Sequence, residues 1–284
     1  MRIPAIRRFA ALLLIGALVA GCQSMQDMIG NAPKPSAHVV GVSIRGLSLQ
    51  SIVLLFDIEV ENPYAVALPL ADLGYALTSN GKNFLEGSLK PTGTIPAHGK
   101  QVLQVPATVQ FSSMASVLKG VKPGAVVPYT ANFKIGVDTP VVGHVDVPLS
   151  KSGELPVPAV PRVEMESFAV EKLGVDQIKA TAKLQIHNNN EFPLDLKRFG
   201  ANFALAGVDI GGGRVGGPIT LPAGKDVAIN IPLSMSPRAV GMSLVNFLRG
   251  KEIAYNVSGA FDADTQFGPL SLPFNHTGNT AVTR

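Results

Sequence analysis

The sequence has one cysteine, Cys22, among 284 residues, which excludes an intramolecular disulfide. It has no G-x-S-x-G segment, the turn that carries the nucleophile of many serine hydrolases. Its histidines lie far apart, without the spacing of metal ligands: His38, His98, His144, His187 and His276. The sequence therefore predicts no catalytic, cofactor-binding or metal-binding residue, and a protein that is not an enzyme.

Charge is also scarce, at 15% of the chain. Three of the 24 Lys and Arg residues stand at the N-terminus (Arg2, Arg7 and Arg8), and without them 21 basic residues face 20 acidic ones. An almost neutral chain without a basic stripe cannot neutralise a phosphate backbone, so no nucleic-acid partner is expected. The 46% of hydrophobic residues argue against disorder, and the length allows one large domain or two ordinary ones.

The only long apolar run follows the three N-terminal arginines, from Phe9 to Ala20. It is shorter than the roughly 20 residues of a membrane span and is typical of a signal peptide. The run ends in Val19-Ala20-Gly21-Cys22, which resembles the lipobox of bacterial lipoproteins. That resemblance implies a signal peptide over 1–21 and a lipid on Cys22; the alternative is an ordinary signal peptide with an incidental cysteine.

The residues after Cys22 predict a location. In the sorting rule that the lipoprotein resemblance brings, a residue other than Asp at position 23, here Gln23, allows export to the outer membrane. Residues 22–37 have no sustained period and contain Pro33 and Pro35, so they read as a lipidated tether. The expected location is the periplasmic face of the outer membrane.

Two segments of similar pattern indicate strands, Phe56–Tyr64 and Leu184–Phe192. Apolar and polar residues alternate in each, which places one face of the strand in a core and the other in solvent. Asn62 and Pro63 then end the first strand with turn residues, and Asn190 is expected to do so in the second. The pattern predicts antiparallel sheets.

These segments belong to a longer internal repeat with an offset close to 127. Its matched positions run in the same order in both halves. They pair Ile58 and Asn62 with Ile186 and Asn190, Pro96-Ala97 with Pro222-Ala223, and Asp138-Thr139 with Asp264-Thr265. We predict a first domain over 38–150, a Pro-rich linker over 151–161, and a second domain over 162–284.

Each copy is expected to carry one short helix. In the first, Ser112 or Ser113 would cap it and Pro123-Gly124 would end it. In the second, Ser236 would cap it and Gly250 would end it. The apolar stripe of this second helix would cover an open end of the sandwich core or, alternatively, form a binding groove or a membrane-seeking face; it consists of Val240, Leu244, Phe247 and Leu248.

The repeat resembles the late-embryogenesis-abundant type 2 domain, also called the water stress and hypersensitive response (WHy) domain. The resemblance rests on a strand ending in Asn62-Pro63, Pro-Leu after it (Pro69-Leu70 and Pro193-Leu194), and the Pro-Ala-x-Gly-Lys turn. Tyr64 departs from the pattern, as does Asn190, which no proline follows. The resemblance implies an all-β fold of two tandem fibronectin-III-like (immunoglobulin-like) antiparallel β-sandwiches, and a role in tolerating drying.

Three polar or glycine-rich patterns have two readings each. Gly211–Gly216 satisfies G-x-G-x-x-G, but Gly217-Pro218 and a strand follow it, so a hairpin turn is favoured over a nucleotide loop. Asp57, Glu59 and Glu61 are an acidic patch or a solvated strand face. Asn188–Asn190 binds a polar ligand or caps a strand end, and capping is favoured.

The preferred function is therefore a non-enzymatic, membrane-anchored lipoprotein that protects proteins or membrane during desiccation and osmotic stress. The alternative is an envelope assembly module, or one that binds lipid or a partner protein. Expected partners are the membrane, through the lipid on Cys22, and client or envelope proteins; no small-molecule substrate is identified.

Overall fold

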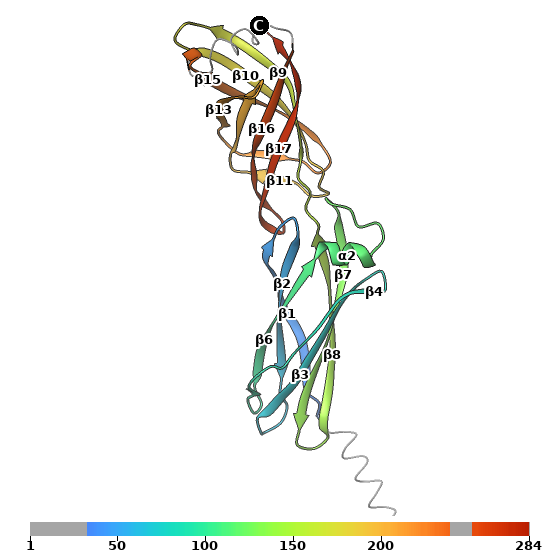
Figure 1. The fold of residues 1–284 in the computed structure, drawn as a ribbon. Coiled ribbons are helices and arrows are strands. Elements are labelled where there is room, and N and C mark those ends of the chain that lie inside the picture. Colours follow the sequence, from blue (N-terminus) through green and yellow to red (C-terminus); the bar gives the residue numbers. More distant parts are fainter. Residues whose placement is uncertain (1–32, 239–251, 284) are drawn as a thin grey trace, which may run out of the picture.

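The computed structural model describes residues 33–238 and 252–283, which form two β-sandwiches stacked end to end (Figure 1). Strands β1 to β8 build the first sandwich and β9 to β17 the second. The prediction of an all-β fold in two tandem sandwiches is confirmed. Residues 1–32, with the signal-peptide and lipobox predictions, lie outside the described residues. No helix in the described part of the chain has the length and apolarity to cross a membrane.

The first sandwich has a three-stranded sheet, β1-β2-β6, facing a second sheet ordered β4-β3-β7-β8, with β5 paired to β3; all pairs are antiparallel. Its elements are β1 Ser36–Leu47, β2 Ser51–Glu61, β3 Leu68–Ser79, β4 Lys82–Leu89, β5 Thr94–Ile95, β6 Lys100–Gln110, α2 Phe111–Val117, β7 Val126–Thr139 and β8 Gly143–Pro156.

The second sandwich repeats this order, with β9 in the place of β1 and β17 in the place of β8. Its elements are β9 Arg162–Leu173, β10 Ile178–His187, β11 Leu194–Leu196, β12 Phe199–Leu205, β13 Val208–Val215, β14 Ile219–Leu221, β15 Asp226–Met235, β16 Glu252–Thr265 and β17 Gly268–Thr283. One pairing departs from the antiparallel prediction. The end of β17 runs parallel to β9, Ala281–Thr283 beside Ser167–Ala169, and joins the two sheets into one path.

The predicted alternation produces both cores. Along β2, half-buried residues alternate with inward residues that are at most 1% exposed. The inward residues are Ile52, Leu54, Phe56, Ile58 and Val60. Phe56 meets Tyr129 and Phe133 edge to face, with ring centroids 6.4 and 5.0 Å apart. In the second core, Phe261 lies 5.2 Å from Phe199 and 4.8 Å from Phe274 between ring centroids. Each sandwich thus has a core of its own.

The two hairpin turns correspond at an offset of 126. Asn80 and Gly81 join β3 to β4 with φ of 48° and 74°, and Ala206 and Gly207 join β12 to β13 with φ of 47° and 80°. The prediction that Gly211–Gly216 forms this turn is therefore wrong. Most of that segment lies in β13, where a Cβ on Gly213 would come within 2.9 Å of the Pro232 oxygen, so the absence of a side chain lets β13 pack closely on β15.

Ala206 provides a test of the hairpin. Alanine has no side chain to compensate for a left-handed φ, whereas asparagine tolerates it. We expect Ala206→Asn to raise the free energy of unfolding of the second sandwich by about 0.5–1 kcal/mol, measured by urea denaturation. The reverse change at the matched turn, Asn80→Ala, should lower that of the first by a similar amount. Two changes of the same sign would contradict the assignment.

Helix α2 differs from its prediction. It begins at Phe111, its N-cap is Gln110 without a side-chain hydrogen bond, and Leu118 ends it, so neither Ser112 nor Ser113 is the cap. The helix continues directly from β6 because Phe111 and Met114 are buried in the first core. In the second copy, Pro237 and Arg238 are helical, as expected after Ser236. The remainder of that prediction, with its apolar stripe, lies outside the described residues.

The connection between the sandwiches is shorter than predicted. Strand β8 runs to Pro156, so residues 151–156 belong to the first sandwich rather than to a linker. Proline fits here because β8 is an edge strand, where one missing N–H breaks no central ladder. Val157 is then buried in the first core, and the buried Ala159 donates its N–H to Asn190 of the second sandwich at 2.8 Å. The connecting segment is therefore packed rather than a free tether.

Candidate functional site

Asn62 lies at the end of β2 and is 1% exposed. Its side-chain Nδ2 donates to the carbonyl oxygens of Val66, Ile95 and Pro96 at 2.8, 3.2 and 2.9 Å. Its Oδ1 accepts the backbone N–H of Tyr64 at 2.8 Å. One side chain thus joins the loop after β2 to the end of β5 by hydrogen bonds to their backbone groups. Pro63 follows Asn62 and has no backbone N–H that would need a hydrogen-bond acceptor.

Asn188 makes the same set of bonds in the second sandwich. Its Nδ2 donates to the carbonyls of Phe192, Leu221 and Pro222 at 3.0, 2.9 and 3.3 Å, and its Oδ1 accepts the N–H of Asn190 at 3.0 Å. The counterpart of Asn62 is therefore Asn188, and the predicted pairing with Asn190 is wrong by two residues. A shift of two keeps every residue on the same strand face, so alternation could not reveal it.

Asn190 instead takes part in the junction between the sandwiches. Its Oδ1 accepts the N–H of Ala159 at 2.8 Å, and its Nδ2 donates to the Ala159 carbonyl at 2.9 Å. Next to it, the Glu191 carboxylate accepts the N–H of Val126 at 2.8 Å, and the Glu191 N–H donates to the Gly124 carbonyl at 2.7 Å. These side-chain amides are occupied by the chain itself, which favours the structural reading over a polar-ligand site.

The outer face of the first three-stranded sheet carries the predicted acidic residues. Lys100 Nζ lies 2.7 Å from Glu59 and 3.9 Å from Glu61, and Gln104 donates to Asp57 at 3.0 Å. The hydrogen bond from Lys100 is the main reason that the pKa of the Glu59 carboxyl is lowered. The acidic patch is thus partly neutralised by cross-strand partners on a solvated face.

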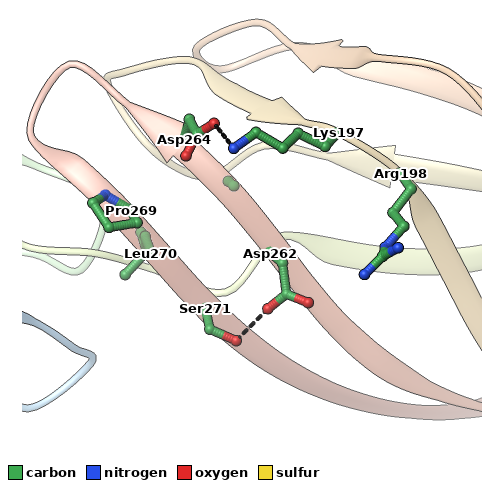
Figure 2. A pocket seen from close by; sticks show the side chains of 8 residues that line it. Lys197, Arg198, Asp262, Asp264, Pro269, Leu270 and Ser271 are labelled. Carbon is green, nitrogen blue, oxygen red and sulfur yellow. Dashed lines mark hydrogen bonds and ion pairs between the residues drawn. The ribbon is translucent and has the colours of Figure 1, made fainter.

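A surface cavity of about 630 Å³ lies over the β16–β17 hairpin of the second sandwich (Figure 2). Two of its carboxylates have partners from the chain: Lys197 Nζ lies 2.8 Å from Asp264, and Ser271 donates to Asp262 at 2.6 Å. Arg198 points toward Asp262 from the other side. None of the eight lining residues is a histidine or cysteine.

The histidines become informative only in the fold. His38 lies 3.3 Å from Glu59, His187 lies 2.9 Å from Asp226, and His144 lies 2.9 Å from Asp138. His144 also lies near Asp72 and Asp146, a group that sequence spacing misses because Asp72 is on β3 and the other two residues are on β8. Only knowledge of strand order and register would have found it.

Comparison with known proteins identifies the repeat. The model of the late embryogenesis abundant protein family, LEA_2, matches residues 57–153 and 183–278. This chain is 31% identical to the desiccation protectant protein Lea14 homolog of Glycine max over 134 residues, which are 47% of this chain and 88% of that protein. It is 29% identical to the desiccation-related protein PCC27-45 of Craterostigma plantagineum over 47% of this chain and 89% of the relative.

Among solved structures, the solution structure of a protein from Arabidopsis thaliana is 26% identical, with a TM-score of 0.38, over 45% of this chain and 85% of that one. The two matched segments of the family model cover more than half of the chain and fall one in each sandwich. The chain therefore belongs to the late embryogenesis abundant protein family LEA_2 and contains two tandem copies of its domain.

Proposed function

We propose that this protein is a non-enzymatic lipoprotein of the bacterial envelope, anchored at the periplasmic face of the outer membrane, that protects proteins or membrane during desiccation and osmotic stress. The observation that carries the proposal is the family membership of both sandwiches, with relatives named for desiccation. Fold alone would be a weak argument, because one fold hosts many functions. The relatives named for desiccation favour stress protection among the functions that the fold could host.

The N-terminal sequence supports the anchor. A basic segment, an apolar run of about a dozen residues and a lipobox-like Val19-Ala20-Gly21-Cys22 stand in the order of a lipoprotein signal. The segment between Cys22 and Ser36, where β1 begins, would span on the order of 20 Å as a flexible coil. This is long enough to separate a folded domain from a membrane surface.

The fold sets the point where such a tether would join the folded domains. Ser36 begins β1 beside Glu61, and Leu47, at the opposite end of β1, packs against the second core. A tether attached at Ser36 would therefore join the first sandwich at the end far from the second. The lipid would hold both sandwiches at high local concentration beside envelope clients.

The test is protection in vitro. Purified full-length protein is dried with a dehydration-sensitive enzyme or with dye-loaded phospholipid vesicles and then rehydrated. We expect retained activity or reduced leakage well above that given by an equal mass of an unrelated β-sandwich protein of similar net charge. Protection no better than that control would reject the proposal and favour the alternative, an envelope module that binds lipid or a partner protein.

A further inference from the structure

Four exposed side chains of the first sandwich meet on the outer face of adjacent strands: Asp72 on β3, Asp138 on β7, and His144 and Asp146 on β8. We call them the His144 cluster. Asp72 and Asp146 both pair with Gly136 of β7 and so form one row across three strands. Asp138 pairs with His144 two residues further along the strands, so their side chains lie on the same face of the sheet. The sheet register therefore fixes which side chains face one another.

The atoms that could bind a metal are close together. His144 Nε2 lies 3.5 Å from Asp146 Oδ1 and 4.0 Å from Asp72 Oδ2. One atom from each of these three residues lies within 4.8 Å of the other two. Ligands bonded to one tetrahedral ion at about 2.1 Å are roughly 3.4 Å apart. Small rotations of exposed side chains would close the remaining difference.

Asp138 orients the histidine. Its Oδ1 lies 2.9 Å from His144 Nδ1, so in the neutral ring Nδ1 donates to the carboxylate and Nε2 carries the lone pair. That lone pair is on the nitrogen that faces Asp72 and Asp146. A carboxylate on the second ring nitrogen is the usual partner of a metal-binding histidine, because it fixes the tautomer and raises the basicity of the ring.

Gly136 keeps the centre of the cluster open. A Cβ at this position would lie 2.9 Å from both carboxylate oxygens of Asp72 and 2.7 Å from His144 Cε1. Gly136 is not among the glycines with positive φ, so its backbone conformation does not require glycine. The glycine is needed for the space above it, where the three ligand atoms converge.

The second sandwich has a different set of residues at this place. At the matching positions of the β16–β17 hairpin, Asp262 replaces Gly136, Pro269 replaces His144 and Ser271 replaces Asp146. The offset of 126 puts Arg198 in the place of Asp72, and in Figure 2 its side chain points toward Asp262. Carboxylates there have Arg198, Lys197 and Ser271 as neighbours.

We propose that Asp72, His144 and Asp146 bind a divalent transition-metal ion of the zinc type, with Asp138 as the outer partner of the histidine. One imidazole nitrogen and two carboxylate oxygens are a ligand set that Zn²⁺ accepts, with water completing the coordination. Asp146 can contribute through Oδ1, because Lys134 Nζ lies 2.7 Å from its other oxygen. No catalytic step is assigned to the ion.

Protons compete with the ion at His144. The hydrogen bond from Asp138, followed by the charges of Asp138, Asp146 and Asp72, raises the pKa of His144. Lys134 is the cation facing the same group, through Asp146, and opposes metal binding. A protonated Nε2 cannot bind metal, so Zn²⁺ affinity should rise as the pH increases through that raised pKa and fall below it.

The test is titration of Zn²⁺ alone into the full-length protein, stripped with chelator and purified in detergent without a histidine tag, by calorimetry. We expect one saturable site that His144→Ala weakens roughly 10- to 100-fold, and Asp138→Asn about tenfold. Gly136→Val should weaken it as well by filling the space between the ligands. Far-UV circular dichroism and the unfolding midpoint show whether each variant is folded.

The matched control is His187→Ala. His187 also lies 2.9 Å from one carboxylate, Asp226, at a strand end, and it is not part of the group of candidate ligands. Its variant should bind Zn²⁺ as the wild type does. Absence of Zn²⁺ binding in the wild type, or equal binding by folded His144→Ala, would overturn the proposal.

Discussion

Asn188→Ala is expected to lower the free energy of unfolding of the second sandwich by about 3–4 kcal/mol. The variant removes the shared partner of the Phe192 and Leu221 carbonyls and of the Asn190 N–H, whereas the Pro222 carbonyl keeps the N–H of Lys225 at 3.2 Å. Asn188 has no exposed surface, so water cannot simply replace the amide. Each buried polar group without a partner costs about 1–3 kcal/mol, partly recovered where the loops relax.

Chemical denaturation of the full-length protein measures this effect, with the two sandwiches followed separately where their transitions separate. Asn62→Ala should produce the same loss in the first sandwich. The adjacent Asn189 is the control, because within the described part of the chain its exposed amide donates to Val160 alone, at 2.9 Å. Asn189→Ala should change stability by no more than about 1 kcal/mol. Similar effects of the changes at 188 and 189 would contradict the assignment of Asn188 as the counterpart of Asn62.

Cys22→Ala is expected to transfer most of the protein from the membrane fraction to the soluble fraction. The proposed anchor is a lipid on the Cys22 thiol, and the chain has no second cysteine that could replace it. An attached acyl chain contributes about 0.8 kcal/mol per buried CH₂, and two or more chains make anchoring stable. Removing the thiol removes the whole of that contribution.

Cell fractionation, with mass spectrometry of the N-terminal peptide, measures the change. Gln23→Asp is the control, since it leaves the thiol in place and by the sorting rule should move the protein only to the inner membrane. Wild-type protein found in the soluble fraction with an unmodified Cys22 would contradict the anchor. Membrane association of Cys22→Ala equal to that of the wild type would contradict it as well.

The sandwich architecture could be predicted from the sequence because its main signals are local. Alternation over Phe56–Tyr64 reports which face of a strand is buried, and Asn80-Gly81 has the residues that a two-residue hairpin requires. The predicted end of the first sandwich lies too early, because Pro156 is typical of a linker although an edge strand accommodates it. Phe111 began its helix without a capping side chain, which no capping rule anticipates.

Asn188 and the His144 cluster are harder to predict because their partners lie far away in the sequence. Three consecutive asparagines hide which amide turns inward, and only the bonds to Leu221 and Pro222 identify Asn188. The His144 cluster needs the register of three strands, with Asp72 more than 70 residues from Asp146 in the sequence. From the sequence alone, Gly136 is an unfavourable residue for a strand. Its role becomes visible only when the side chains of Asp72 and His144 are known to lie over it.

The most direct measurement of the proposed function is survival of a deletion strain through drying and high osmolarity, beside strains restored with wild-type protein or with Cys22→Ala. We expect the deletion strain to lose viability, the wild-type copy to restore it, and the unanchored variant to restore it poorly at equal protein level. Equal survival of the deletion and parent strains under both stresses would contradict anchored stress protection.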